Sequence, residues 1–471
     1  MKNLYILGIV GCLFMSSCQD FLEKEPSTAL PVEEAITSMT DLKYAVNGIP
    51  YLLSQDRMTY SADFAIYADL RGEDFYAISN NNQAGILARY SINKYSAEAY
   101  YAYYYFYKAI ANVNKILNVI DEVPYTENEK ATFDDYKGQL YAWRALLHFD
   151  LARYFCRIPT TGVDINAANS GLVLSTEAYD NNYIGERATL KETYEQIFKD
   201  FNTALPLLSK EKHDGYINYW AALALRSRAY LYNGQYNEAL NDAKEVIACD
   251  KYKLYTIDNY EEAWGKEFTD ESLFEMKITS VYNAQRNAVG YYCDANGYGE
   301  CAFVKTAWLY QYLTNNTDDV RSKMIKVQED AEEYGEPGTY PAKYPGRENS
   351  LYINNPKIIR LSEVYLIAAE AALYAENPEK DTDFYMNELR KNRISNYTNG
   401  SDFTIDDVLK ERRVELFTEN SMSFDYWRNK KSVKSFHVGE SINYDDYRTV
   451  LPIPQDEIDL SGGILVQNPN Y

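Results

Sequence analysis

Residues 221–232 read Ala-Ala-Leu-Ala-Leu-Arg-Ser-Arg-Ala-Tyr-Leu-Tyr, Asn233-Gly234 follows, and residues 235–247 read Gln-Tyr-Asn-Glu-Ala-Leu-Asn-Asp-Ala-Lys-Glu-Val-Ile. Both runs place apolar and small residues at helical spacing. Gly234 supplies the turn between them, because glycine adopts left-handed backbone angles without a steric cost. The small residues let two helices approach closely. The stretch therefore predicts an antiparallel helical hairpin.

The same pattern recurs on both sides of this stretch. Another hairpin begins at Leu361 and returns through Leu389. Apolar stripes at steps of three and four mark helix pairs within 103–155 and 190–249, and a C-terminal group within 358–428. Hairpins of this kind look like tetratricopeptide repeats, which need neighbours to cover their apolar faces.

Three stretches interrupt the helical pattern. Residues 54–102, 255–356 and 431–471 are loop-rich, and the second contains short β-like runs such as residues 273–278. Loops of this length are usually functional when they are ordered. We therefore expect a mainly α protein in which residues 31–471 form a single body. Its tetratricopeptide-like helical scaffold would carry a loop-rich, partly β ligand-binding face.

The first residues predict export and lipidation. Residues 4–15 are almost wholly apolar and follow Lys2, which is typical of a signal peptide and too short to span a bilayer. Small residues precede Cys18, as in the lipobox of bacterial lipoproteins. We expect residues 1–17 to be removed, Cys18 to carry the lipid, and residues 18–30 to form a tether. Cys12 is a competing lipobox, and a cleaved signal without lipid is the alternative.

Composition excludes some functions and leaves others open. The formal net charge of −22 repels phosphate backbones, so nucleic-acid binding is not expected. The 47 tyrosines are unusual. A ring with a polar tip packs in a core or faces a wet ligand. Most of these tyrosines are expected to be packing residues, and the remainder could line a binding surface.

The cysteines and histidines predict neither a metal site nor a cofactor. No Cys-x-x-Cys pair occurs, and the three histidines are far apart in sequence. The loop that begins at Asp294 lacks the later oxygen ligands of a calcium loop. Cys293 and Cys301 bracket a glycine-containing turn that could close as a disulfide, because an envelope location permits oxidation.

The C-terminal third carries a family resemblance. Six sequence blocks occur in order: residues 360–371, 387–393, 411–419, 424–428, 451–454 and 467–471. With the lipoprotein start, this order resembles the SusD/RagB family of outer-membrane nutrient-binding lipoproteins. The resemblance implies a tetratricopeptide-like fold and a partner, a SusC-like TonB-dependent outer-membrane transporter. It also implies an oligosaccharide ligand, or a peptide in the RagB branch, and a lipid-anchored protein facing outside the cell.

Candidate ligand contacts come from two of the loop regions. A sugar presents hydroxyls around an apolar ring face, so its binder needs flat aromatics with Asn, Asp and Arg nearby. Residues of these types cluster near 65–90 and 280–310. The candidates are Arg71, Asp74, Tyr76, Asn81, Tyr90, Tyr291, Tyr292 and Tyr298.

Enzymatic activity is not expected. No Gly-x-Ser-x-Gly elbow, His-Glu-x-x-His motif or phosphate loop is present. Acidic pairs suited to glycoside hydrolysis exist, but a solvated acidic surface is the far better explanation for them. The alternating charges of residues 411–419 predict an exposed helix. A structural or adhesive surface protein is the third alternative.

Overall fold

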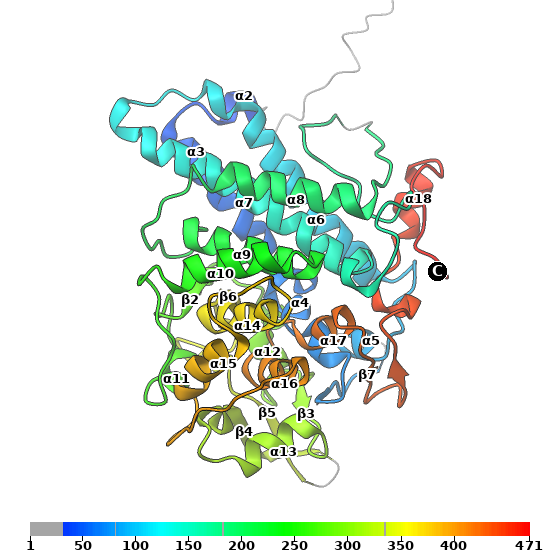
Figure 1. Ribbon diagram of the computed structural model, residues 1–471. Coiled ribbons are helices and arrows are strands. Elements are labelled where there is room, and N and C mark those ends of the chain that lie inside the picture. The colour runs from blue at the N-terminus through cyan, green and yellow to red at the C-terminus, as the bar shows by residue number, and fades with distance from the viewer. Residues whose placement is uncertain (1–31, 81, 181–182, 334–335) are drawn as a thin grey trace, which may run out of the picture.

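The structure is a computed structural model that describes residues 32–80, 82–180, 183–333 and 336–471. Helices dominate it (Figure 1). The first group is α2 Val32–Ala35, α3 Met39–Leu53, α4 Asp63–Leu70, α5 Gly85–Ala88, α6 Ala97–Val119, α7 Lys130–Phe155, α8 Leu190–Ala204, α9 Tyr219–Asn233 and α10 Tyr236–Ile247. The second group is α11 Tyr260–Ala263, α12 Val289–Tyr292, α13 Trp308–Asn315, α14 Leu361–Ala372, α15 Thr382–Lys391, α16 Ile405–Glu415, α17 Met422–Arg428 and α18 Gln455–Leu460.

The hairpin predicted from residues 221–247 forms as α9 and α10. Gly234 ends α9 with a φ of +76°. The two helices lie close enough for the Ser227 hydroxyl to donate to the Ala239 carbonyl at 2.7 Å. Helices α6 and α7, α7 and α8, and α14 and α15 also pack as neighbours, and α10 contacts α14. The predicted tetratricopeptide-like helical fold is confirmed.

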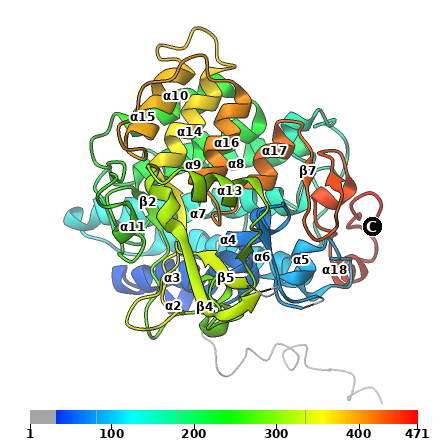
Figure 2. The ribbon, with the colours of Figure 1, turned by 90° about the horizontal axis from the view of Figure 1, so that it is seen from below.

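Short strands pair in the loop-rich parts. In the described residues they form four two-stranded antiparallel sheets, in which β1 pairs with β3, β2 with β6, β4 with β5, and β7 with β8. Figure 2 shows β4 and β5 on the lower side of the molecule. The strands are β1 Phe75–Tyr76, β2 Ser272–Glu275, β3 Ala302–Phe303, β4 Ile325–Glu333, β5 Glu336–Pro341, β6 Lys357–Arg360, β7 Val433–Lys434 and β8 Ser441–Ile442.

Apolar burial differs between the helical scaffold and the loop-rich part. One core cluster runs from Ile36 to Leu465 and contains the buried faces of α6 to α10 and α14. A smaller cluster lies under the loop-rich part and joins α4, α12 and α13 through residues such as Ile66, Tyr292 and Leu309. The loops that carry the candidate site therefore rest on a packed base.

The charges at residues 411–415 of α16 are buried, so the expected exposed helix is wrong. Glu411, Arg412, Arg413 and Glu415 are all buried, and Glu415 has 0% of its surface exposed. Each finds a partner of opposite sign on another element; Arg393 Nε, for example, lies 2.9 Å from Glu415 Oε2. A helix with alternating charges has the same sequence pattern whether its charges face solvent or form buried ion pairs with other elements. Thr404 followed three residues later by Asp407 is a capping-box pattern, and the box forms at the start of α16, where Thr404 N donates to Asp407 Oδ2 at 2.9 Å.

Candidate functional site

A short sheet brings the two predicted loop regions together. Phe75 lies opposite Phe303, and Tyr76 lies opposite Ala302. The third loop region also reaches this place, since Ala77 N donates to His437 Nε2 at 2.9 Å. Segments far apart in the chain therefore meet at one part of the surface.

Side-chain hydrogen bonds fix the loops that emerge from this sheet. Ser79 Oγ donates to Glu300 Oε2 at 2.6 Å. The Tyr292 hydroxyl donates to Gln83 Oε1 at 2.7 Å. The loop after β1 is thereby held against the loop before β3. Such anchoring lowers the entropic cost of presenting loop side chains to a ligand.

Three tyrosine rings and one arginine gather on this surface. We name Arg286, Tyr291, Tyr298 and Tyr352 the Tyr291 cluster. The Tyr291 ring meets the Tyr298 ring edge-on at 4.8 Å and lies 5.4 Å from the Tyr352 ring. All three tyrosines are half-buried, and Arg286 is exposed. Arg286 hydrogen-bonds to Tyr352, and this bond raises the pKa of the guanidinium.

The Tyr291 cluster has the chemistry to bind a polyhydroxylated ring. Phenol faces pack against apolar C–H surfaces, and phenol hydroxyls and a guanidinium hydrogen-bond with hydroxyls. Edge-on contact between Tyr291 and Tyr298 restricts the ring orientations.

Five of the eight predicted contacts lie in the interior. The Arg71 guanidinium is 1% exposed and lies 3.8 Å from the Tyr90 ring centroid. Asp74 is 2% exposed and accepts from Arg413 Nε at 2.5 Å. Both side chains pack between elements and present no face to a ligand.

The buried tyrosines have similar packing roles. The Tyr76 ring lies 5.7 Å from Phe436. The Tyr90 hydroxyl donates to the Arg71 carbonyl at 2.8 Å. Tyr292 has 0% exposure. Asn81 lies outside the described residues. From the predicted set, Tyr291 and Tyr298 reach the surface, and their contact with a ligand stays a prediction.

Two members of the Tyr291 cluster were not among the predicted contacts. Arg286 belongs to the predicted loop, and its type fits the chemistry. Tyr352 comes from a turn more than fifty residues later, and no local spacing ties it to Tyr291. The only sequence feature that points to Tyr352 is the general tyrosine content of residues 255–356.

The predicted disulfide involves two neighbouring buried cysteines. Cys293 and Cys301 are free thiols in the structure and are both buried. Burial and a hydrogen bond to Cys293 raise the pKa of the Cys301 thiol well above its usual range. The thiol form oxidises slowly because the thiolate is the reactive species. The bridge stays a prediction.

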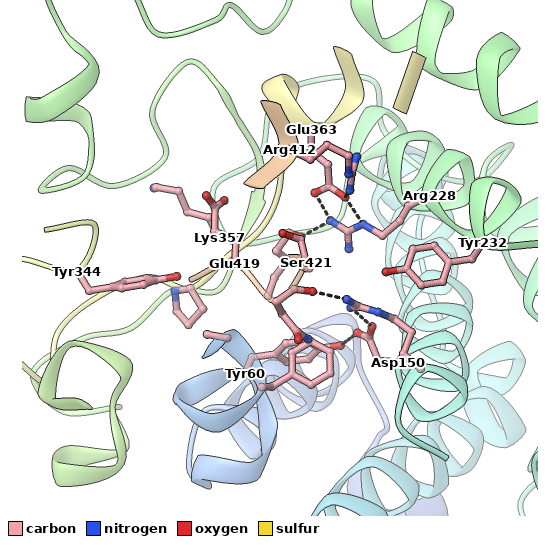
Figure 3. Close-up of a pocket in the computed structure, with 16 residues that line it drawn as sticks. Tyr60, Asp150, Arg228, Tyr232, Tyr344, Lys357, Glu363, Arg412, Glu419 and Ser421 are labelled. Carbon is pink, nitrogen blue, oxygen red and sulfur yellow. Dashed lines mark hydrogen bonds and ion pairs between the residues drawn. The ribbon is translucent and has the colours of Figure 1, made fainter. Parts of the chain in front are cut away.

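A small cavity lies deeper in the protein (Figure 3). It encloses about 30 Å³ and is lined by residues that include Asp150, Arg153, Arg228, Glu363 and Arg412. The Arg228 guanidinium holds Glu363 through two bonds of 2.7 and 2.6 Å. Small-molecule sites usually occupy about 300–1,000 Å³, whereas this volume admits about two water molecules. Its charged pairs therefore serve structure rather than ligand capture.

The described part of the chain contains no group of three or more His, Cys, Asp or Glu side chains arranged to hold a metal. The Asp294 carboxylate contacts Lys326 and Gln328. Its oxygens are used within the protein.

Comparisons with protein families agree with the fold. The family described as "SusD family" matches residues 209–471. The chain belongs to the SusD family. A second family, described as "Starch-binding associating with outer membrane", matches residues 20–231. The SusD motifs noted at 360–371 and beyond thus lie within a matched region.

Solved structures and curated relatives extend this assignment. A SusD superfamily protein from Bacteroides thetaiotaomicron superposes with a TM-score of 0.84 at 30% identity and covers 92% of this chain and 100% of its own. A SusD superfamily protein from Bacteroides vulgatus gives 0.84 at 28% identity, covering 92% and 99%. A SusD-like protein of Formosa agariphila is 22% identical over 92% of both chains.

A more distant structure contains a sugar. Surface glycan-binding protein A from Bacteroides thetaiotaomicron, in complex with laminarihexaose, superposes with a TM-score of 0.74 at 19% identity, covering 92% of this chain and 100% of its own. At that identity the likeness shows the shared SusD fold. In the described residues of the present chain, every helix is too short or too polar to cross a membrane.

Proposed function

We propose that this SusD-family protein is a lipid-anchored outer-membrane protein that captures oligosaccharide nutrients and delivers them to a SusC-like TonB-dependent transporter. The observation that carries the proposal is the Tyr291 cluster, where loops far apart in sequence present tyrosine faces and Arg286 on a SusD scaffold. The complex of a SusD-fold protein with laminarihexaose supports a saccharide as the ligand class.

The binding experiment uses soluble residues 19–471. A glycan array and a peptide pool are probed in parallel. Binding to one glycan class supports capture and names the substrate, whereas binding to peptides alone moves the protein to the RagB-like alternative. Silence on both contradicts ligand capture by the isolated protein and favours the structural or adhesive alternative.

Variants then test the surface. Arg286→Ala and Tyr298→Ala are expected to weaken binding about tenfold each, because they remove a charged hydrogen-bond donor and an aromatic face. Tyr44→Ala is the control, since Tyr44 is 68% exposed and outside the cluster. Equal affinity in both cluster variants and the control contradicts the site.

The anchor and the partner need separate tests. Cys18→Ala is expected to move the protein from the membrane fraction to the soluble fraction. Copurification of a barrel transporter with the tagged, lipidated protein would support the uptake role. Membrane attachment that persists in Cys18→Ala contradicts Cys18 as the anchor.

The enzyme alternative has a direct control. No catalytic constellation accompanies the Tyr291 cluster in the described residues, so each bound glycan is expected to be recovered unchanged. Incubation followed by chromatography of the glycan checks this expectation. Shortened products would contradict a pure binding role.

A further inference from the structure

A second tyrosine-lined groove lies on another part of the molecule. It holds about 640 Å³ between α6, residues 173–180 and 183–185, and α18. In Figure 1, α18 and α6 lie in the upper half, whereas α12 and β3 of the Tyr291 cluster region lie below. We name this depression the α6 groove. Its volume lies in the range of about 300–1,000 Å³ that is usual for ligand pockets.

Exposed aromatic rings line the α6 groove. Tyr104 is 38% exposed and Tyr183 is 45% exposed. The Tyr100 ring stacks on the Tyr104 ring with 11° between their planes and 5.8 Å between centroids. Tyr183 stacks on Tyr179 on the opposite wall. Both walls thus offer flat aromatic surface that the fold leaves uncovered.

Charged side chains without ion-pair partners accompany these rings. Lys108 Nζ lies 5.3 Å from the Tyr104 ring centroid. Glu457 is half-buried in the groove, and burial raises the pKa of its carboxyl. Across the described chain, neither Lys108 nor Glu457 forms an ion pair. A donor and an acceptor therefore remain available beside the aromatic faces.

The walls of the α6 groove are held in place before any ligand arrives. The Tyr107 hydroxyl donates to the Val173 carbonyl at 2.9 Å, which ties the loop to α6. Asn114 Nδ2 donates to the Ser175 carbonyl at 3.0 Å. At the other end, Gln455 N donates to the Lys94 carbonyl at 2.9 Å and fixes the start of α18. A preformed groove binds at lower entropic cost.

We infer that the α6 groove is a second binding subsite for a neutral oligosaccharide, separate from the Tyr291 cluster. This inference rests on the proposed function. Flat phenols with an adjacent amine and carboxylate suit vicinal hydroxyls and apolar ring faces. A concavity of about 640 Å³ fits a chain of sugars better than a protein surface, which buries about 800 Å² per partner. The net charge of −22 disfavours a polyanionic chain.

The test counts sites by titration calorimetry of soluble residues 19–471. The probes are laminarihexaose, maltohexaose, cellohexaose, xylohexaose and mannohexaose. The groove variant is Tyr104→Ala with Tyr183→Ala, the cluster variant is Arg286→Ala with Tyr298→Ala, and Tyr44→Ala is the control. Because Tyr104, Tyr183 and Tyr44 are exposed, these variants are expected to fold normally.

For a probe that binds, we expect two sites in the wild type and in the control. The groove variant and the cluster variant should each weaken one site at least tenfold and retain the other, and their combination should lose both. Glu457→Gln, which keeps the side-chain shape, should weaken the groove site alone.

Other outcomes overturn the inference in distinguishable ways. One site in the wild type that the groove variant leaves unchanged overturns the second subsite and keeps the proposed function. The same titration result, one site that the groove variant leaves unchanged, is expected if a protein partner normally covers the groove. No binding of any probe by the wild type overturns the inference together with saccharide capture.

Discussion

The core around α9 is mainly apolar, whereas the core beneath α16 is built largely from buried ion pairs. Around α9 the buried residues are mainly alanine and leucine, and Ala224 and Leu225 are 0% and 1% exposed. Beneath α16 the fully buried side chains include Arg393 and Glu415, held together by ion pairs. Apolar packing tolerates small local adjustments, whereas a buried charge needs its partner at a fixed place. The comparison predicts that the two regions respond differently to mutation and pH.

The ionic region centres on one carboxylate. Glu415 accepts from Arg393 Nε at 2.9 Å, from Arg360 Nη1 at 3.1 Å and from Arg321 Nη1 at 3.2 Å. These guanidinium groups hold the pKa of Glu415 well below its usual range despite burial. The arginines come from three separate elements, so Glu415 ties the loop-rich part to the helical scaffold.

The largest effect is expected for Glu415→Gln. It keeps the shape and leaves three buried guanidinium groups short of a counter-charge, so the free energy of unfolding should fall by about 3–5 kcal/mol at pH 7. Chemical denaturation measures the change. Glu379→Gln is the matched control, because Glu379 pairs with Lys244 at the surface and its loss should lower the free energy of unfolding far less. Equal losses in the two variants would show that the buried network is not what holds this region.

The second-largest effect is the pH dependence of stability in the helical region, which depends on His148. His148 on α7 is fully buried, and burial lowers its pKa from 6.5 to about 4, with Asp200 opposing and Arg144 adding to the shift. The neutral ring is therefore favoured in the folded protein. This contribution is complete above pH 6.5 and is lost as the pH falls toward 4.

Between pH 7 and pH 5 the wild type should lose about 2 kcal/mol that His148→Gln does not lose. Urea unfolding at both pH values, compared between the two proteins, checks this difference. Parallel pH dependences would mean that His148 is not a source of acid sensitivity.

A smaller effect is expected at the start of α16. Thr404→Ala removes the hydroxyl that accepts from Asp407 N and should lower the free energy of unfolding by about 1 kcal/mol. Thr203→Ala is the control, because that hydroxyl bonds back to the Lys199 carbonyl within α8 and caps no helix end. If thermal unfolding shifts equally in both variants, the cap adds nothing specific.

The smallest effect on stability is expected for Arg286→Ala. Arg286 is exposed, so its removal should leave the free energy of unfolding nearly unchanged while weakening saccharide binding. Arg393→Ala is the contrasting change, since it removes a fully buried guanidinium that contacts both Glu271 and Glu415. A large stability loss in Arg286→Ala would move this residue from the binding surface to the scaffold.

The loop regions of the candidate site were predictable from the sequence, but its individual contact residues were not, because those depend on interactions between residues far apart in the chain. Loop regions 65–90 and 280–310 were predicted from residue types, and the structure brings them together through β1 and β3. The sequence could not show which side chains in these loops are exposed and which are buried. Arg71 and Arg286 are both arginines in polar, tyrosine-rich loops, yet one is 1% exposed and the other lies on the surface. No periodicity in such loops reveals which side faces the core.

The sequence by itself determined the helical hairpins, the turn at Gly234, the Thr404 cap and the family, because these depend on residues within a few positions or on the order of motifs. Only the tertiary structure decided which charges are buried and which tyrosines are exposed. The Arg360–Glu271 pair joins residues 89 positions apart, and Tyr352 meets Tyr291 from a separate turn. Such contacts follow from how the elements pack in space, and local sequence patterns do not predict them.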